Sequence, residues 1–180
     1  MANHCRNIIK ITLKDKLDES AGELFLKEFC EKIATEGFLS LVDEDWNNRT
    51  NSEKLEMFGS DGVYSSTGYR IKESEITKKE RNIEFHITSR WSPFVGFVKK
   101  LTEKYPELIV GNIKYYEPGV IFAGEETFDA GEQIFSYKTF NEVEELLIFG
   151  LKNGFECIDY VDDAYYDTHP ELVERLRAYG

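Results

Sequence analysis

The sequence predicts a single α+β domain built on a ferredoxin-like split βαβ sheet, with helices on one face and extra C-terminal strands and helices. Three observations predict this fold. Strand-like and helix-like apolar patterns alternate along the chain, its 180 residues suit one core, and a hydrophobic share of 41% is enough to build that core. We place residues 1–138 in the core, residues 38–80 in an irregular insertion within it, and residues 139–180 in an acidic helical extension.

The first two elements follow from apolar spacing. In residues 7–13, Ile9 and Leu13 share a face with Ile11, which is typical of a strand packed against a core. Ser20 and Glu23 have the spacing of a capping box and predict the start of a helix. Gly37 predicts its end.

The insertion is the least regular stretch. We expect a polar loop with Trp46 as an aromatic anchor, a short helix at 52–58 and a strand at 62–71. After the insertion we predict a strand at 82–89, and then a helix that begins at Ser92-Pro93 and ends at Pro106. Three strands follow at 108–117, 120–125 and 133–138. The C-terminal elements are a helix with a capping box at 139–142 and its end at Gly154, a strand at 155–161, and a short helix from Pro170.

Charge is segregated along the chain. Residues 1–116 contain 19 acidic and 18 basic side chains, whereas residues 117–174 contain 15 acidic and only two basic ones, Lys138 and Lys152. A negative field of this kind repels a phosphate backbone, so we expect no direct binding to nucleic acid. It attracts basic protein surfaces.

Cysteine usage and hydropathy set further limits. The three cysteines, Cys5, Cys30 and Cys157, are widely spaced, which favours reduced thiols in a cytoplasmic protein over a disulfide framework. They match neither a zinc site nor an iron–sulfur cluster, and we predict no metal and no cofactor. No apolar run is long enough to cross a membrane.

Two pairs of side chains are candidates for catalysis. Cys5 and His86 form a nucleophile and base if their strands are neighbours, and Glu117 and Glu125 form an acid and base if they converge. The alternatives are a buried thiol with a solvent-facing imidazole, and carboxylates that cap turns or face water. We expect no catalytic residue, so that an enzyme is the less favoured class.

The candidate binding residues are aromatic and acidic. In the C-terminal part, tyrosines alternate with aspartates, a combination that suits protein binding because rings supply contact area and charges supply steering. The alternative is that the rings pack the tail onto the core and the acids stay solvated. The full candidate set is Trp91, Tyr115, Tyr116, Glu117, Asp159, Tyr160, Asp162, Asp163, Tyr165, Tyr166 and Asp167.

Three segments resemble a known family. Residues 1–7 (Met-Ala-Asn-His-Cys-Arg-Asn), 89–93 (Ser-Arg-Trp-Ser-Pro) and 115–124 (Tyr-Tyr-Glu-Pro-Gly, then Phe-Ala-Gly) are similar, in order, to segments of the YubB-type ferredoxin-like domain family. His4 stands where that family usually has tryptophan. The resemblance implies a bacterial protein carried on plasmids and phages, and it supplies no catalytic residues.

These observations favour a non-enzymatic accessory protein of a mobile genetic element. Its acidic C-terminal surface would bind a basic protein, and in a sharper form would imitate the charge of DNA. An enzyme or small-ligand binder with a pocket near Trp91 and Tyr115–Glu117 is the rival hypothesis, and a homodimer formed through a sheet face or edge is the third.

Overall fold

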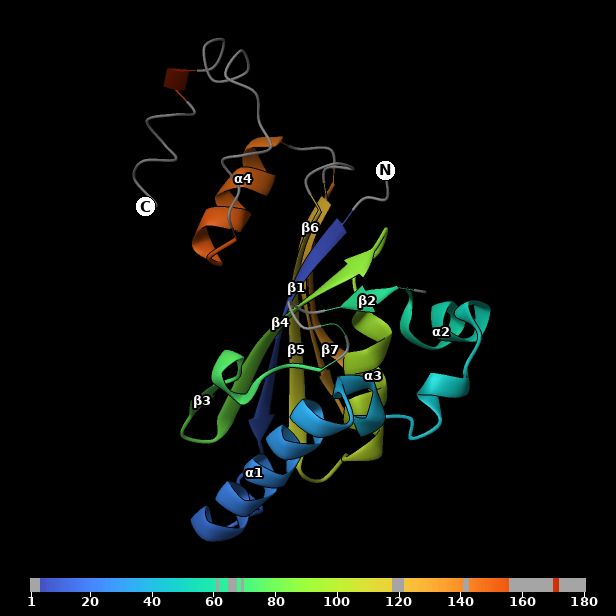
Figure 1. Ribbon diagram of the computed structural model, residues 1–180. Helices are drawn as coiled ribbons and strands as arrows, with labels where there is room; N and C mark the ends of the chain where they lie inside the picture. Colours follow the sequence, from blue (N-terminus) through green and yellow to red (C-terminus); the bar gives the residue numbers. More distant parts are fainter. Residues whose placement is uncertain are drawn as a thin grey trace.

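The computed structural model describes residues 4–60, 62–64, 68, 70–117, 122–140, 143–155 and 170–171 (Figure 1). One antiparallel sheet forms its centre, with helices on both faces. In chain order the elements are β1 (His4–Leu13), α1 (Glu19–Thr35), the 3-10 helices η1 (Phe38–Leu41) and η2 (Trp46–Asn48), α2 (Asn51–Phe58), β2 (Val63–Tyr64), the 3-10 helix η3 (Glu73–Glu75), β3 (Thr77–Lys79), β4 (Asn82–Arg90), α3 (Val95–Lys104), β5 (Ile109–Glu117), β6 (Phe122–Asp129), β7 (Glu132–Phe140) and α4 (Val143–Lys152).

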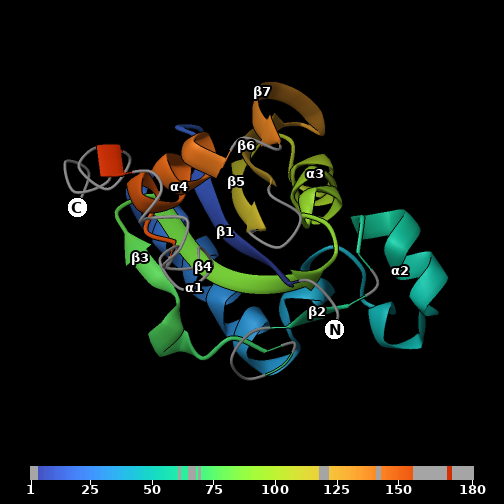
Figure 2. The same ribbon diagram turned by 90° about the horizontal axis from the view of Figure 1, so that it is seen from above.

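The strand order is β2-β4-β1-β5-β6-β7, and β3 also pairs with β4. Strand β1 lies between β4 and β5, so that Ile9 is opposite Phe85 on one side and Ile113 on the other. The α+β prediction is confirmed, and the central position of β1 agrees with the split βαβ order. Strands β6 and β7 extend the sheet as a meander, which places β7 at one margin, far from β2 (Figure 2).

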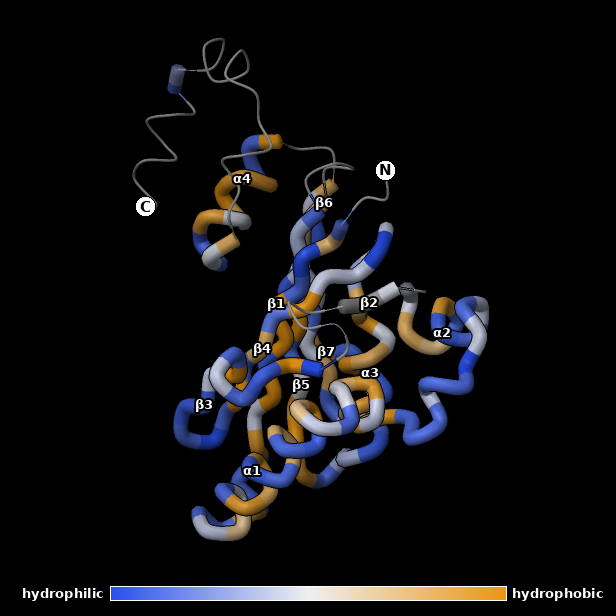
Figure 3. The backbone as a smooth tube through the Cα atoms, viewed as in Figure 1, coloured by the Kyte–Doolittle hydropathy of each residue, from blue (hydrophilic) through white to orange (hydrophobic). Residues whose placement is uncertain are grey.

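Alternate residues of the central strands form the larger core, on the face covered by α1 and α3. In β1 these are the odd-numbered residues, among which Ile9 and Ile11 are fully buried. Four phenylalanine rings pack together in this core with centroids 5.4 to 6.4 Å apart, namely Phe38, Phe85, Phe94 and Phe97. Apolar colouring is accordingly concentrated in the sheet and its helices, and the turn at β3 is hydrophilic (Figure 3).

The opposite face of the sheet carries a smaller core under α4. Its buried members are Ile8, Tyr116, Ala123, Leu146, Leu147, Phe149 and Phe155. Helix α4 lies beside the end of the sheet at which β1 and β6 begin (Figure 1), so the rest of this face is not covered by a described helix. The expectation of helices on one face holds for α1 and α3, and the additional C-terminal helix α4 covers part of the other face.

The insertion is more ordered than its sequence indicates. Its anchor Trp46 is buried, as expected. A capping box begins α2, because the Glu53 amide donates to the Thr50 hydroxyl over 3.3 Å and the Glu53 carboxylate accepts from the Thr50 amide over 2.8 Å. Gly59, with φ of +82°, ends this helix in the left-handed conformation that glycine favours.

Two predicted helix caps are wrong. Helix α1 is capped by Asp18, whose carboxylate accepts from the Ala21 amide over 2.8 Å, and Ser20 lies inside the first turn. Thr139 belongs to β7, and its hydroxyl donates to Glu145 over 3.2 Å. Residues 118–121, at the start of the strand predicted at 120–125, nearly all of the strand at 155–161 and most of the helix from Pro170 lie outside the described residues.

Candidate functional site

Three candidate residues at the end of β5 are buried. The exposed fractions of Tyr115, Tyr116 and Glu117 are 3%, 0% and 2%. Tyr115 points to the face of α3 and its hydroxyl donates to Glu126 over 3.1 Å, whereas Tyr116 lies in the core under α4 and stacks on Phe155. Successive strand residues face opposite sides, so these three do not form one exposed group.

Trp91 is exposed. It follows β4 with φ of +63°, a left-handed backbone that costs free energy for a bulky residue, and 55% of its surface is accessible. Ser92, the next residue, stabilises the backbone turn at Trp91 through two hydrogen bonds. The Ser89 hydroxyl donates to the Ser92 carbonyl over 2.6 Å, and the Ser92 hydroxyl donates to the Gly59 carbonyl. The other seven candidates, Asp159, Tyr160, Asp162, Asp163, Tyr165, Tyr166 and Asp167, lie outside the described residues.

The strands of Cys5 and His86 are neighbours, but the two side chains lie on opposite faces. Cys5 is opposite Ser89 on the α3 face, and His86 is opposite Ile8 on the other face and is exposed to solvent. Burial, reinforced by the negative charge of Glu117, raises the pKa of the Cys5 thiol to about 12. A thiol that stays protonated is a poor nucleophile, so this pair does not fit covalent catalysis.

A buried amide connects β1 to the turn after β4. The Asn7 side chain donates to the Cys5 carbonyl and to the Ser89 hydroxyl, each over 2.9 Å, and accepts from the Phe94 amide over 3.0 Å. Asn7 is 1% exposed. Because this one side chain bonds within β1, to the end of β4 and to the residue that precedes α3, it fixes the end of the sheet from which Trp91 projects.

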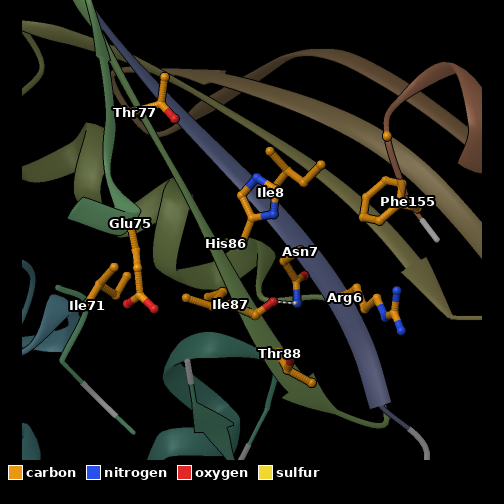
Figure 4. A pocket seen from close by; sticks show the side chains of 11 residues that line it. Arg6, Asn7, Ile8, Ile71, Glu75, Thr77, His86, Ile87, Thr88 and Phe155 are labelled. Atoms are coloured by element: carbon orange, nitrogen blue, oxygen red, sulfur yellow. Dashed lines mark hydrogen bonds between the residues drawn. The ribbon is translucent and has the colours of Figure 1, made fainter. Parts of the chain in front are cut away.

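A cleft of about 570 Å³ lies on the sheet face that α4 leaves uncovered. Figure 4 shows His86 between Glu75 on one side and Phe155 on the other. The lining is mixed: Arg6, Asn7, Ile8, Ile71, Glu75, Thr77, His86, Ile87, Thr88, Gly154 and Phe155. It includes neither Trp91 nor the Tyr115–Glu117 segment, so the cleft is not the pocket that the sequence suggested. Among the described residues, no group of three histidine, cysteine or carboxylate side chains could hold a metal ion.

The feature that sequence reasoning missed is the surface of β7. Four of its nine residues are large apolar side chains with high exposure, Ile134 at 61%, Phe135 at 49%, Tyr137 at 41% and Phe140 at 61%. Only Thr139 of this strand is buried. The signal in the sequence was an apolar run in the last strand of the meander, which we assigned to a strand but not to a site.

The surroundings of β7 are acidic. The described residues from Phe122 to Phe155 include six acidic and two basic side chains. Lys14 pairs with Asp129, and Lys138 pairs with Glu126 over 3.0 Å. Three further carboxylates, Glu125, Glu132 and Glu145, have no cation within 4.0 Å among the described residues. An apolar strand is thus bordered by negative charge that the described side chains do not neutralise.

Comparisons with protein-family models, curated proteins and solved structures found no match to this chain. The resemblance to the YubB-type family therefore stays a prediction. None of the helices within the described ranges is both long and apolar enough to span a membrane.

Proposed function

We propose that this chain is a non-enzymatic protein-binding module whose acidic C-terminal third binds a basic partner. The proposal rests on one observation. Carboxylates that no described cation neutralises lie in the same region as the exposed apolar side chains of β7. Exposed apolar groups supply binding free energy, and surrounding charges select the partner and speed its approach. In its sharper form, the partner is a DNA-binding protein and the acidic surface takes the place of its DNA.

The described side chains favour binding over catalysis. Cys5 is protonated and buried, and burial together with the charge of Glu126 raises the pKa of the Tyr115 hydroxyl. Glu126 itself is 3% exposed and bonds to Tyr115, Gln133 and Lys138, which is the arrangement of a structural carboxylate. These groups support the sheet, and none of them lines the cleft described above.

The test is to capture proteins from a lysate of the host cell with the immobilised chain and to measure each purified candidate in titrations. One variant carries Asn in place of Asp159, Asp162, Asp163 and Asp167. A matched control has the same net charge but changes acids elsewhere, with D15N, E23Q, E28Q and E56Q.

We expect the first variant to bind about tenfold more weakly than the control, with a loss that shrinks at high salt because exposed charges are screened. Equal affinities for the two variants would contradict the proposal. If duplex DNA competes with the chain for the same partner, the result supports imitation of DNA. If it does not compete, the result supports general binding of basic proteins.

A further inference from the structure

Strand β7 is a long unpaired edge within the described part of the sheet. It pairs with β6 from Phe122 opposite Phe140 to Asp129 opposite Glu132, and no described strand lies on its other side (Figure 2). The amide and carbonyl groups of such an edge are a template for another strand. The opposite margin of the sheet differs, because β2 and β3 have only two and three residues.

Natural edges are normally protected against pairing, and β7 has little of this protection. Lysines, prolines, inward charges and bulges are the usual devices. Strand β3 follows that rule with the sequence Thr-Lys-Lys. Strand β7 has one lysine, Lys138, and a register shift near Thr127 that leaves the segment from Phe135 to Phe140 regular. Three of the four exposed apolar side chains lie in that regular segment.

Side-chain contacts on both faces of the sheet fix the position of β7. Lys138 and Gln133 both bond to the buried carboxylate of Glu126 on the α3 face. On the other face, the ring of Tyr137 stacks on Phe149 of α4 with centroids 5.8 Å apart. A strand braced on both faces loses little conformational freedom when it is paired, which favours binding at this position.

We propose that β7 accepts an extended segment of the partner as an additional strand, and that this segment alternates apolar residues with lysine or arginine. The inference rests on the proposed function and specifies its site and mode. Backbone hydrogen bonds along the edge would supply affinity, and alternate side chains would supply selectivity. The cations would face the α4 side of the sheet, where Glu125, Glu132 and Glu145 lie and where their aliphatic stems would pack on Phe135 and Tyr137. The apolar residues would face the α3 side and pack on Phe140.

Charge decides between this occupant and a second copy of the chain. A β7–β7 pair would bring the two acidic regions together, and the chain carries a net charge of -12. Like charges that face each other across an interface oppose association. A cationic strand meets the same surface with the opposite sign and is therefore the favoured occupant.

The probe is a synthetic peptide of the length of β7 that alternates lysine with valine and phenylalanine. Its matched control has the same sequence with N-methyl groups on every second amide, which removes hydrogen-bond donors along one edge and keeps the charge. Titration with the full chain measures both affinities, and hydrogen exchange of the chain reports which amides become protected.

We expect the plain peptide to bind and to slow exchange in β7, and the N-methylated peptide to bind about tenfold more weakly. A chain variant with F135T and F140T, which keeps residues that favour strands, should also lose about tenfold in affinity. A control variant with L24T and L55T removes two exposed side chains on helices, at 57% and 53% exposure, and should bind as the wild type does.

The inference is overturned if the peptide leaves exchange in β7 unchanged, or if the F135T and F140T variant binds like its control. In either case the proposed function stands as long as captured basic partners still distinguish the Asn variant from its charge-matched control, and it fails separately if they do not. A dimer in solution that disappears in the F135T and F140T variant would replace the cationic strand by a second copy and would also overturn the inference.

Discussion

Replacing Asn7 by alanine tests whether the buried amide fixes the end of the sheet. The substitution removes the acceptor of the Phe94 amide and the donor to the Cys5 carbonyl and the Ser89 hydroxyl. Ser89 keeps its bond to the Ser92 carbonyl, so the Phe94 amide is the group most clearly left without its partner. One buried unpaired amide costs about 1–3 kcal/mol, and with the lost bonds we expect the free energy of unfolding to fall by about 2–4 kcal/mol.

The matched control is Asn112→Ala. Asn112 also makes two side-chain bonds, to Glu125 and Thr127, each over 2.9 Å, but it lies on the open face of the sheet where water replaces them. We expect a loss below about 1 kcal/mol there. Urea unfolding, followed by the fluorescence of the buried Trp46, measures the loss in unfolding free energy of each variant. The comparison uses variants whose denaturant slope m equals that of the wild type. Losses that agree within about 0.5 kcal/mol would refute the role assigned to Asn7.

Three more predictions concern the pH dependence and the packing. The raised pKa of Cys5 means that the unfolded thiol ionises from pH 9 while the folded one stays protonated until about 12, so stability should fall across this range. Urea titrations at pH 8 and 10 should show a smaller fall for C5A than for the wild type, and equal falls would contradict the assignment. Gly124→Ala places a Cβ 2.5 Å from the Tyr115 ring and 2.6 Å from the Tyr137 carbonyl, and calorimetry should show a loss of about 1–3 kcal/mol. Gly154→Ala meets no atom within 4 Å and should cost less, since only its positive φ opposes the side chain. Phe97→Ala should cost about 3–5 kcal/mol because this ring is fully buried, a value that urea unfolding can check against the exposed Phe140→Ala, which should be nearly neutral.

Local patterns predicted the elements well where one face of a strand is buried. The strand predicted at 82–89 corresponds to β4, in which Ile83, Phe85 and Ile87 alternate toward the core and His86 faces the solvent. The helix caps were less predictable, because Asp18 and Ser20 are both good caps and only the tertiary entry angle of the chain chooses between them.

The candidate site was harder to predict, because exposure depends on contacts between distant segments. The polar hydroxyl of Tyr116 is compatible with a surface position, but α4 packs over this side chain and buries it. The position of β7 at the margin of the sheet likewise depends on which strands pair, and pairing is not encoded in any one segment. Sequence reasoning therefore found the apolar strand and could not tell that its side chains remain exposed.

The two cores of unequal size imply a hierarchy of stability within one chain. The core on the α1 and α3 face holds most of the buried side chains, whereas the core under α4 has seven buried members. Separation of α4 from the sheet thus exposes far less apolar surface than global unfolding does. Helix α4 is expected to undock in sub-global fluctuations while β1, β4 and β5 remain folded, which makes the smaller core the first of the two cores to yield under mild stress.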